Sequence, residues 1–274
     1  MKTETQYVSG YWPLPNNKKK RRDYYDAILR KTLSRLKRKK LIFFSNDSDV
    51  LEAVCLDCSR YGISLQNIFL SLEDLPSRSL AHALVTSCSR MFLDAWPAPR
   101  SFHSDKGMIH YWRDLQGSGI ETYTDMLSIW MSKVALVTQI ATGLDADYPL
   151  AWVDGSLARI QGNRSNWRFW NQQVRLGYIS HYASPMKYRS RALPVSAGFL
   201  LSNASVWNEL NSLFNEIAWQ AVKMPYGHDE ETIFGECWLR RPELFRCIGK
   251  PYQSLGIRST LRWRVQDRLT GLFS

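Results

Sequence analysis

Short apolar runs alternate along this chain with longer segments in which apolar residues recur at helical spacing. The apolar runs lie at 7–10, 41–44, 68–72, 150–153 and 195–201, and polar or glycine-containing turns bound them. Compact apolar runs of this length predict strands buried inside a sheet.

Between the predicted strands, the spacing of apolar residues predicts helices. Their expected ranges are 18–40, 48–60, about 77 to the region of Pro97, 121–142, 203–222 and 228–239. Strands that alternate with helices are typical of an α/β fold, so we expect a mostly parallel central sheet flanked by helices. No repeat or linker interrupts the pattern, and a length of 274 residues suits one domain spanning 1–274. The polar, arginine-rich stretch 161–191 is expected to be irregular.

The net charge of +11 is concentrated in two segments. Residues 18–40 contain twelve Lys or Arg against two Asp, and residues 250–274 contain five against one. In the first segment, apolar residues from Tyr25 to Leu36 share one helical face, which predicts a basic amphipathic helix. Three interpretations stay open for its basic face: a solvated surface, attraction to anionic lipid headgroups, or contact with nucleic-acid phosphates. No nucleic-acid-binding motif accompanies the charge, so a nucleic-acid partner is not expected.

Several classes of protein are disfavoured by what the sequence lacks. No stretch approaches the roughly 18 apolar residues of a membrane span, and Met1–Gly10 has no apolar signal core. We therefore expect a cytoplasmic protein, with peripheral contact at the inner face of the cytoplasmic membrane as an extension of that expectation. The patterns GxSxG, GxxxxGK[ST], GxGxxG and HExxH are absent, which argues against hydrolases, P-loop enzymes, nicotinamide-binding proteins and zinc hydrolases of those types.

One candidate site follows the strand predicted at 150–153, which ends in Asp154, Gly155 and Ser156. Ligands of open α/β sheets bind at the carboxyl ends of strands. A carboxylate there can hold Mg²⁺ or Mn²⁺, and such an ion can bridge the two phosphates of a nucleotide sugar. The alternative is that Asp154 only forms a turn.

A second candidate combines Gly198 with the carboxylates Asp229 and Glu230. Gly198 follows Ala197 and permits close approach of the backbone to a ligand. Asp229 and Glu230 stand at a predicted helix start, where carboxylates can serve as acid, base or charge stabiliser. The helix dipole favours acidic residues at this position in any helix, so a purely structural role is the alternative.

A third candidate is the turn after the first strand. Ser9, Gly10 and Tyr11 offer backbone amides and an aromatic ring to a nucleotide base and ribose. The alternative is a plain connection between strand and helix. Lys133, within the helical pattern of 121–142, could neutralise a phosphate, although a lone helical lysine is usually solvated.

Taken together and in order, these segments resemble the HtrL/YibB family of bacterial proteins. The likeness is carried by Ser9–Pro13 with Asn16, Asn17 and Lys18, by Leu41–Phe44, Ser132–Lys133, Trp152–Gly155, Ala197–Phe199 and His228–Ile233. It implies a GT-A-like glycosyltransferase associated with lipopolysaccharide or capsule. It also implies a metal at Asp154, nucleotide contacts from Lys133 and residues 9–11, and an acceptor near Asp229 and Glu230. Many GT-A enzymes carry Asp-x-Asp at the metal site, but here position 156 is Ser.

The expected activity is transfer of a hexose or related sugar from a nucleotide sugar donor to a glycan or glycolipid acceptor. The acceptor class would be lipopolysaccharide core, O-antigen or capsule, and Mn²⁺ or Mg²⁺ the cofactor. Asp229 or Glu230 would act as base in an inverting reaction or stabilise charge in a retaining one. Two rival interpretations stay open: a noncatalytic basic protein that binds nucleic acid or anionic membrane, and a related fold without activity.

Overall fold

A computed structural model describes residues 4–17, 21–93, 119–159, 169–184, 187–188, 191–223 and 229–249. The basic segment predicted at 250–274 lies outside these ranges, as do residues 18–20 at the start of the predicted basic helix. Within the ranges, no helix has both the length and the apolar character needed to cross a bilayer.

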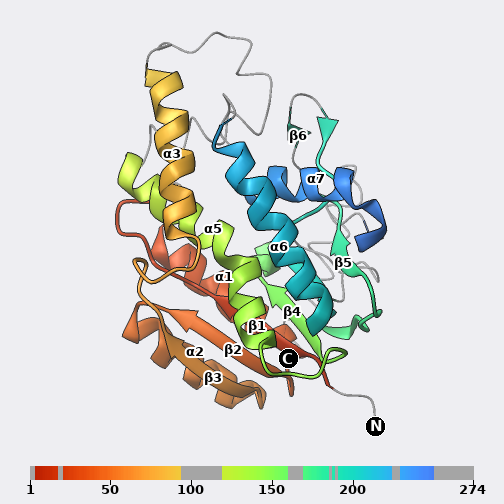
Figure 1. Cartoon of the computed structure of the whole chain (residues 1–274). Coiled ribbons are helices and arrows are strands. Elements are labelled where there is room, and N and C mark those ends of the chain that lie inside the picture. Colours follow the sequence, from red (N-terminus) through yellow and green to blue (C-terminus); the bar gives the residue numbers. More distant parts are fainter. Residues whose placement is uncertain are drawn as a thin grey trace, which may run out of the picture.

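Seven strands form one sheet in the order β3-β2-β1-β4-β8-β5-β9 (Figure 1). Their bounds are Gln6–Gly10 for β1, Lys40–Ser45 for β2, Ser64–Phe69 for β3, Pro149–Val153 for β4, Ile179–Tyr182 for β5, Phe199–Asn203 for β8 and Phe245–Gly249 for β9. Two short strands, β6 (Lys187–Tyr188) and β7 (Arg191–Ala192), pair with each other in a separate ribbon.

The sheet is mixed, which corrects the mostly parallel sheet expected from the sequence. Strands β1, β2, β3 and β4 pair in parallel, but β8 runs antiparallel to both β4 and β5. All five residues of β4 and of β8 are buried. A strand buried on both faces shows the same apolar run in either direction, so the pattern carries no information about orientation.

Helices cover the two faces of the sheet. Apolar residues of α3 (Arg78–Leu93), α5 (Ile120–Ala141), α6 (Ala204–Ala221) and α7 (Glu230–Arg240) belong to one core cluster. Figure 1 shows α3, α5 and α6 packed across this face. Apolar residues of α1 (Arg22–Arg35) and α2 (Ser48–Tyr61) belong to the cluster on the other face.

Alternation along β4 divides its side chains between the two cores. Leu150 and Trp152 join the cluster with α5 and α6, whereas Ala151 and Val153 join the cluster with α1 and α2. Burial of one large apolar side chain stabilises a fold by about 1.5–3 kcal/mol. Both faces therefore anchor β4 firmly, and the residue that follows it, Asp154, has a fixed position.

The ends of α2 agree with the range predicted from the sequence. The Asp47 side chain caps the helix by accepting a hydrogen bond from the amide of Val50 at 3.0 Å. Gly62, with φ of 64°, ends it in the left-handed conformation that glycine adopts at low cost.

Four strands of the seven-stranded sheet differ from the sequence-based predictions. β8 was predicted at 195–201 but occupies Phe199–Asn203. β3 was predicted at 68–72 but occupies Ser64–Phe69 at the sheet edge, where most of its residues are partly or fully exposed. β5 lies inside the stretch expected to be irregular, and β9 was not predicted. Both are short, and β9 is largely exposed, so neither has the long apolar run that marks a buried strand.

The predicted basic helix forms as α1 and buries Ile28, Leu29, Thr32 and Leu33. It ends at Arg35, before the predicted end at 40, and Lys40 instead begins β2. Part of its basic face contacts the rest of the chain. The guanidinium of Arg30 pairs with Asp57 at 3.2 Å, and that of Arg35 lies 5.3 Å from the ring centre of Trp170. These contacts give part of the basic face a role in packing.

Candidate functional site

The candidate residues gather along one edge of the sheet. The carboxyl ends of β1, β2 and β4 lie together there, and β8 contributes its amino end because it runs in the opposite direction. The register places Val153 opposite Phe199, and the amide of Asp154 donates to the carbonyl of Gly198 at 2.9 Å. The reversed strand thus brings two predicted site residues side by side.

A buried ion cluster of Lys133, Asp154 and Glu230 forms the centre of this edge. The Lys133 Nζ lies 3.0 Å from Asp154 Oδ1 and 2.9 Å from Glu230 Oε1. The Trp152 indole donates to the same Asp154 oxygen at 2.8 Å. Side-chain exposure is 4% for Lys133, 11% for Glu230 and 22% for Asp154, so Asp154 is the member most accessible to a ligand.

Lys133 is buried because the helix that carries it is buried on more than one side. Ser132 and Val134, its neighbours in α5, are buried as well. Burial by itself lowers the pKa of Lys133, but the carboxylates of Asp154 and Glu230 raise it by more, and the net direction is upward. The lysine is therefore a fixed positive charge, and the sequence-based alternative of a solvated lysine is wrong.

Three consecutive carboxylates at the start of α7 have different partners. Asp229 caps the helix: its Oδ1 accepts from the Thr232 amide at 2.9 Å, and its own amide donates to the Thr232 hydroxyl. Glu230 contacts Lys133. Glu231 accepts hydrogen bonds from the Ala197 amide, at 3.1 Å, and from the Ser184 hydroxyl.

Crowding of these carboxylates raises two pKa values. Burial raises the pKa of Asp229 to about 7, with a further increase from Glu230, while Thr232 and Lys133 act in the opposite direction. Burial and the charges of Glu230 and Asp229 raise the pKa of Glu231 to about 8, against the hydrogen bonds from Ser184 and Ala197. Lys133 thus offsets only part of the effect of burial on Asp229, and acids with pKa values raised in this way are common at functional sites.

Two glycines permit close packing around Asp154. A Cβ at Gly198 would lie 3.2 Å from Leu157 and 3.7 Å from Asp154 Oδ2. A Cβ at Gly155 would lie 3.2 Å from Leu29 and 3.4 Å from the Gly10 carbonyl. Gly155 therefore lets the turn after Asp154 pack against the end of β1, a contact that the sequence did not reveal.

The predicted nucleotide turn is ordered by contacts of its backbone. The amide of Tyr11 donates to the Phe44 carbonyl at 3.0 Å, and the Ser45 hydroxyl donates to the Tyr11 carbonyl at 2.7 Å. Gly10 is required because a Cβ there would lie 2.4 Å from the Trp12 ring. Ser9 is buried in β1, so its side chain is enclosed in the protein.

Aromatic side chains gather where this turn meets α1. The Tyr11 and Tyr25 rings are 6.1 Å apart, and the Tyr24 ring is 5.6 Å from that of Tyr25. Burial raises the pKa of the nearby Asp26 carboxyl, while the charge of Arg22 and a hydrogen bond from Tyr11 lower it by less. Tyr25 and Asp26 were assigned to the basic helix in the sequence, and no local motif linked them to Tyr11.

The residues present do not fit a divalent metal held by protein ligands. Within the described ranges, no group of three or more His, Cys, Asp or Glu side chains could hold an ion. The Asp154 Oδ1 accepts from Trp152 and contacts Lys133, and its Oδ2 lies 3.3 Å from the same ammonium. Binding of Mn²⁺ or Mg²⁺ at Asp154 stays a prediction, and the arrangement around this carboxylate does not support it.

Comparisons with known proteins add little to this geometry. No family model matches the chain, and no curated protein matches it. One solved structure, described as "Structure of Transferase", is similar over 88% of this chain and 84% of that chain, with 10% sequence identity and a TM-score of 0.43. A similarity this low supports no argument about function, and the resemblance to the HtrL/YibB family rests on the sequence motifs alone.

Proposed function

We propose that this chain is a GT-A-type glycosyltransferase that moves a sugar from a nucleoside-diphosphate donor to a bacterial surface glycan. The observation that carries the proposal is the Lys133–Asp154–Glu230 cluster at the carboxyl edge of an open α/β sheet. This edge is where such sheets bind ligands. The motif resemblance supplies the reaction class.

The donor would bind over the adjoining end of β1 and turn after β4. Tyr11 offers an aromatic ring for stacking against a base, and Gly155 brings the two turns into contact. Gly198 has no side chain, so the backbone next to Asp154 would be able to approach the diphosphate or sugar closely. The distribution of aromatic and charged groups thus suits a ligand with an aromatic base at one end and a polar reacting centre at the other.

The acceptor would be activated by a carboxylate at the start of α7 or by Asp154. Of the two predicted catalytic residues, Glu230 contacts Lys133 at the centre of the cluster, whereas Asp229 makes the contacts of a helix cap. We therefore assign Glu230 the chemical role, as base or as charge stabiliser, and Asp229 the role of holding Glu230 in place.

A screen of purified protein against UDP, GDP, CMP and dTDP sugars would test donor binding by thermal shift. Stabilisation by one nucleotide class is the expected result, because a ligand that binds only the folded state raises its apparent stability. Asp154→Asn should abolish sugar transfer while the protein still folds, since Glu230 remains as a counter-ion of Lys133; its cost in stability should resemble that of Glu230→Gln. No shift with any donor, or near-normal transfer by Asp154→Asn, would defeat the proposal.

The adjacent carboxylates give a matched pair for the catalytic role. Glu230→Gln should reduce transfer by about 100-fold or more, as removal of a catalytic acid or base does. Asp229→Asn should retain most activity, because asparagine is as good an N-cap as aspartate. Comparable losses in both variants would contradict the division of roles.

The acceptor and its location belong to the same proposal. Lys31 and Arg38 on and after α1 are exposed and have charge suited to anionic lipid headgroups. Peripheral binding at a membrane would bring the enzyme close to a lipid-linked glycan. Cosedimentation with vesicles of anionic phospholipid, weakened by Lys31→Glu with Arg38→Glu, is the expected result; equal binding to neutral vesicles would argue against it.

A further inference from the structure

We propose that the Lys133 ammonium is the resident cation of this site, standing where a divalent metal would otherwise sit between Asp154 and Glu230, and that donor binding is metal-independent. The first part concerns the ion cluster alone. The second part rests on the proposed glycosyltransferase function.

The geometry of the two carboxylates supports this assignment. Asp154 ends a central strand and Glu230 begins α7, so two elements far apart in sequence direct oxygens at one point. Lys133 Nζ occupies that point, 3.0 Å from one carboxylate and 2.9 Å from the other. Carboxylates that converge in this way are the ligands that hard divalent ions prefer.

An ion and the ammonium cannot share this space. Mg²⁺ and Mn²⁺ need oxygens at about 2.0–2.3 Å and several ligands around them. Here the Lys133 side chain fills the gap, its exposure is 4%, and the Trp152 indole already donates to Asp154 Oδ1. A metal would also be repelled by the adjacent positive charge.

The remaining ligand set points the same way. Ser156 stands two residues after Asp154, so no second carboxylate follows on the same turn. The other acids nearby are engaged: Asp229 caps α7, and Glu231 accepts from Ala197 and Ser184. If a metal displaced Lys133, its remaining ligands would have to come from groups other than these acids.

The role inferred for Lys133 is to neutralise the site. Without it, Asp154 and Glu230 would present two negative charges to an incoming diphosphate and repel it. With it, the two carboxylates keep fixed positions and the edge of the sheet is closer to neutral. Lys133 is then a positioning residue that acts through Asp154 and Glu230, because its buried ammonium does not itself reach solvent.

Electron paramagnetic resonance of Mn²⁺ mixed with the full chain tests the cation position directly. The wild type should leave the free Mn²⁺ signal unchanged. Lys133→Met vacates the position and should bind about one equivalent of Mn²⁺, a gain that a further Asp154→Asn change removes. Lys133→Arg keeps the charge and is the matched control, which should bind none.

Two results would overturn the assignment. One is Mn²⁺ binding by the wild type that Asp154→Asn abolishes. The other is a folded Lys133→Met variant, shown by circular dichroism to retain its helices, that binds no Mn²⁺. If Lys133→Met does not fold, the wild type and Lys133→Arg decide the question alone.

Nucleotide binding separates this inference from the proposed function. Equal thermal stabilisation by UDP, GDP, CMP or dTDP sugar in EDTA and in Mn²⁺ supports metal-independent binding. Stabilisation only in Mn²⁺ overturns metal independence and leaves the transferase proposal standing. Absence of stabilisation in both, with no Mn²⁺ bound by the wild type, overturns the transferase proposal and leaves the cation assignment standing.

Discussion

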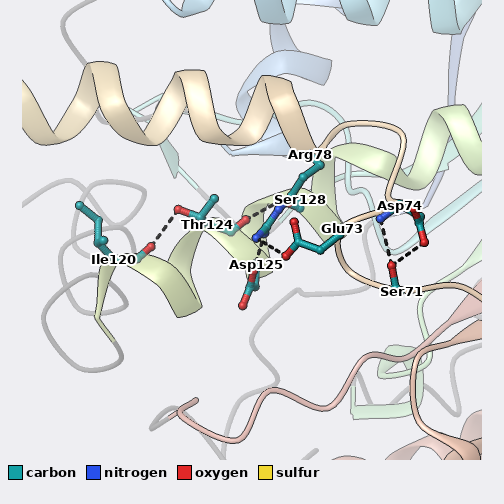
Figure 2. A network of polar contacts seen from close by, with 8 residues as sticks. All are labelled: Ser71, Glu73, Asp74, Arg78, Ile120, Thr124, Asp125 and Ser128. Carbon is teal, nitrogen blue, oxygen red and sulfur yellow. Dashed lines mark hydrogen bonds and ion pairs between the residues drawn. The ribbon is translucent and has the colours of Figure 1, made fainter.

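Two ion networks that include residues of helix α5 each place one cation between two carboxylates. They differ mainly in the burial of the cation and of the glutamate. Figure 2 shows the first, in which Arg78 contacts Asp125 and, at 2.9 Å, Glu73. Side-chain exposure there is 26% for Arg78, 23% for Asp125 and 76% for Glu73, against 4% for Lys133 in the second network. The same charge pattern therefore serves two purposes, which depend on how much water reaches it.

The Arg78 network holds two helices together, because it joins the start of α3 to α5. In the adjacent turn, the Ser71 hydroxyl donates a hydrogen bond to Asp74 at 2.6 Å. Glu73 is largely solvated, so its attraction to Arg78 is weakened by water and salt. The Lys133 network instead encloses its cation, and each of its charges depends on the others.

Removal of Lys133 should have the largest effect on stability. Lys133→Met leaves Asp154 and Glu230 without their cation, and breaking one side of a buried ion pair costs about 3–5 kcal/mol. Urea unfolding measures the loss, with Lys133→Arg as the control. A loss below about 1 kcal/mol would show that the cluster behaves like an exposed pair.

Removal of Arg78 should cost less, about 1–2 kcal/mol, because water reaches the groups left behind. Arg78→Met leaves Asp125 without its cation, while Glu73 stays solvated. The loss should shrink in high salt, where the wild-type attraction is screened. Urea unfolding in low and high salt provides the measurement, and a loss equal to that of Lys133→Met would remove the distinction between the networks.

The crowding of acids around Lys133 predicts that stability depends on pH. The pKa of Glu231 is raised from 4.5 to about 8 in the folded state. Between these two pH values the folded state therefore holds a proton that the unfolded state has released. The stabilisation that results from this difference in proton binding is complete below pH 4.5 and is lost as pH rises through 8. Glu231→Gln keeps an acceptor for Ala197 and cannot ionise.

The Glu231→Gln variant should therefore lose less stability than the wild type between pH 5 and pH 8. A difference of about 1 kcal/mol is expected, since Glu231 is partly exposed and Asp229 still titrates in the same window. Melting temperatures across that range measure it. Parallel curves for the two proteins would show that Glu231 is ionised throughout.

Sequence patterns predicted the elements better than their assembly. The apolar run of β4 and the helical pattern of α2 are local features, and both were predicted correctly. The reversal of β8 and the short strand β5 depend on pairing between distant residues, which a single run does not encode.

Within the site, the sequence predicted individual residues but not the contacts between them. Asp154, Gly198 and Lys133 were predicted as site residues, and the structure brings them together. The hydrogen bond from Trp152 to Asp154 and the contacts of Glu231 were missed, because Trp152 was interpreted as a strand residue and Glu231 as one of several acids at a helix start. Long-range polar contacts leave no periodic signal in a chain.

Glu73 provides the smallest expected effect and the closest match to Glu230, because each is one of two carboxylates that flank a cation. Glu73→Gln should change stability by less than about 0.5 kcal/mol, since an exposed ion pair contributes little in water. Glu230→Gln should cost more, because Lys133 then shares its buried charge with Asp154 alone. Urea unfolding of both variants beside the wild type compares them under one condition. Equal losses would mean that exposure, 76% against 11%, does not decide what a carboxylate contributes in these networks.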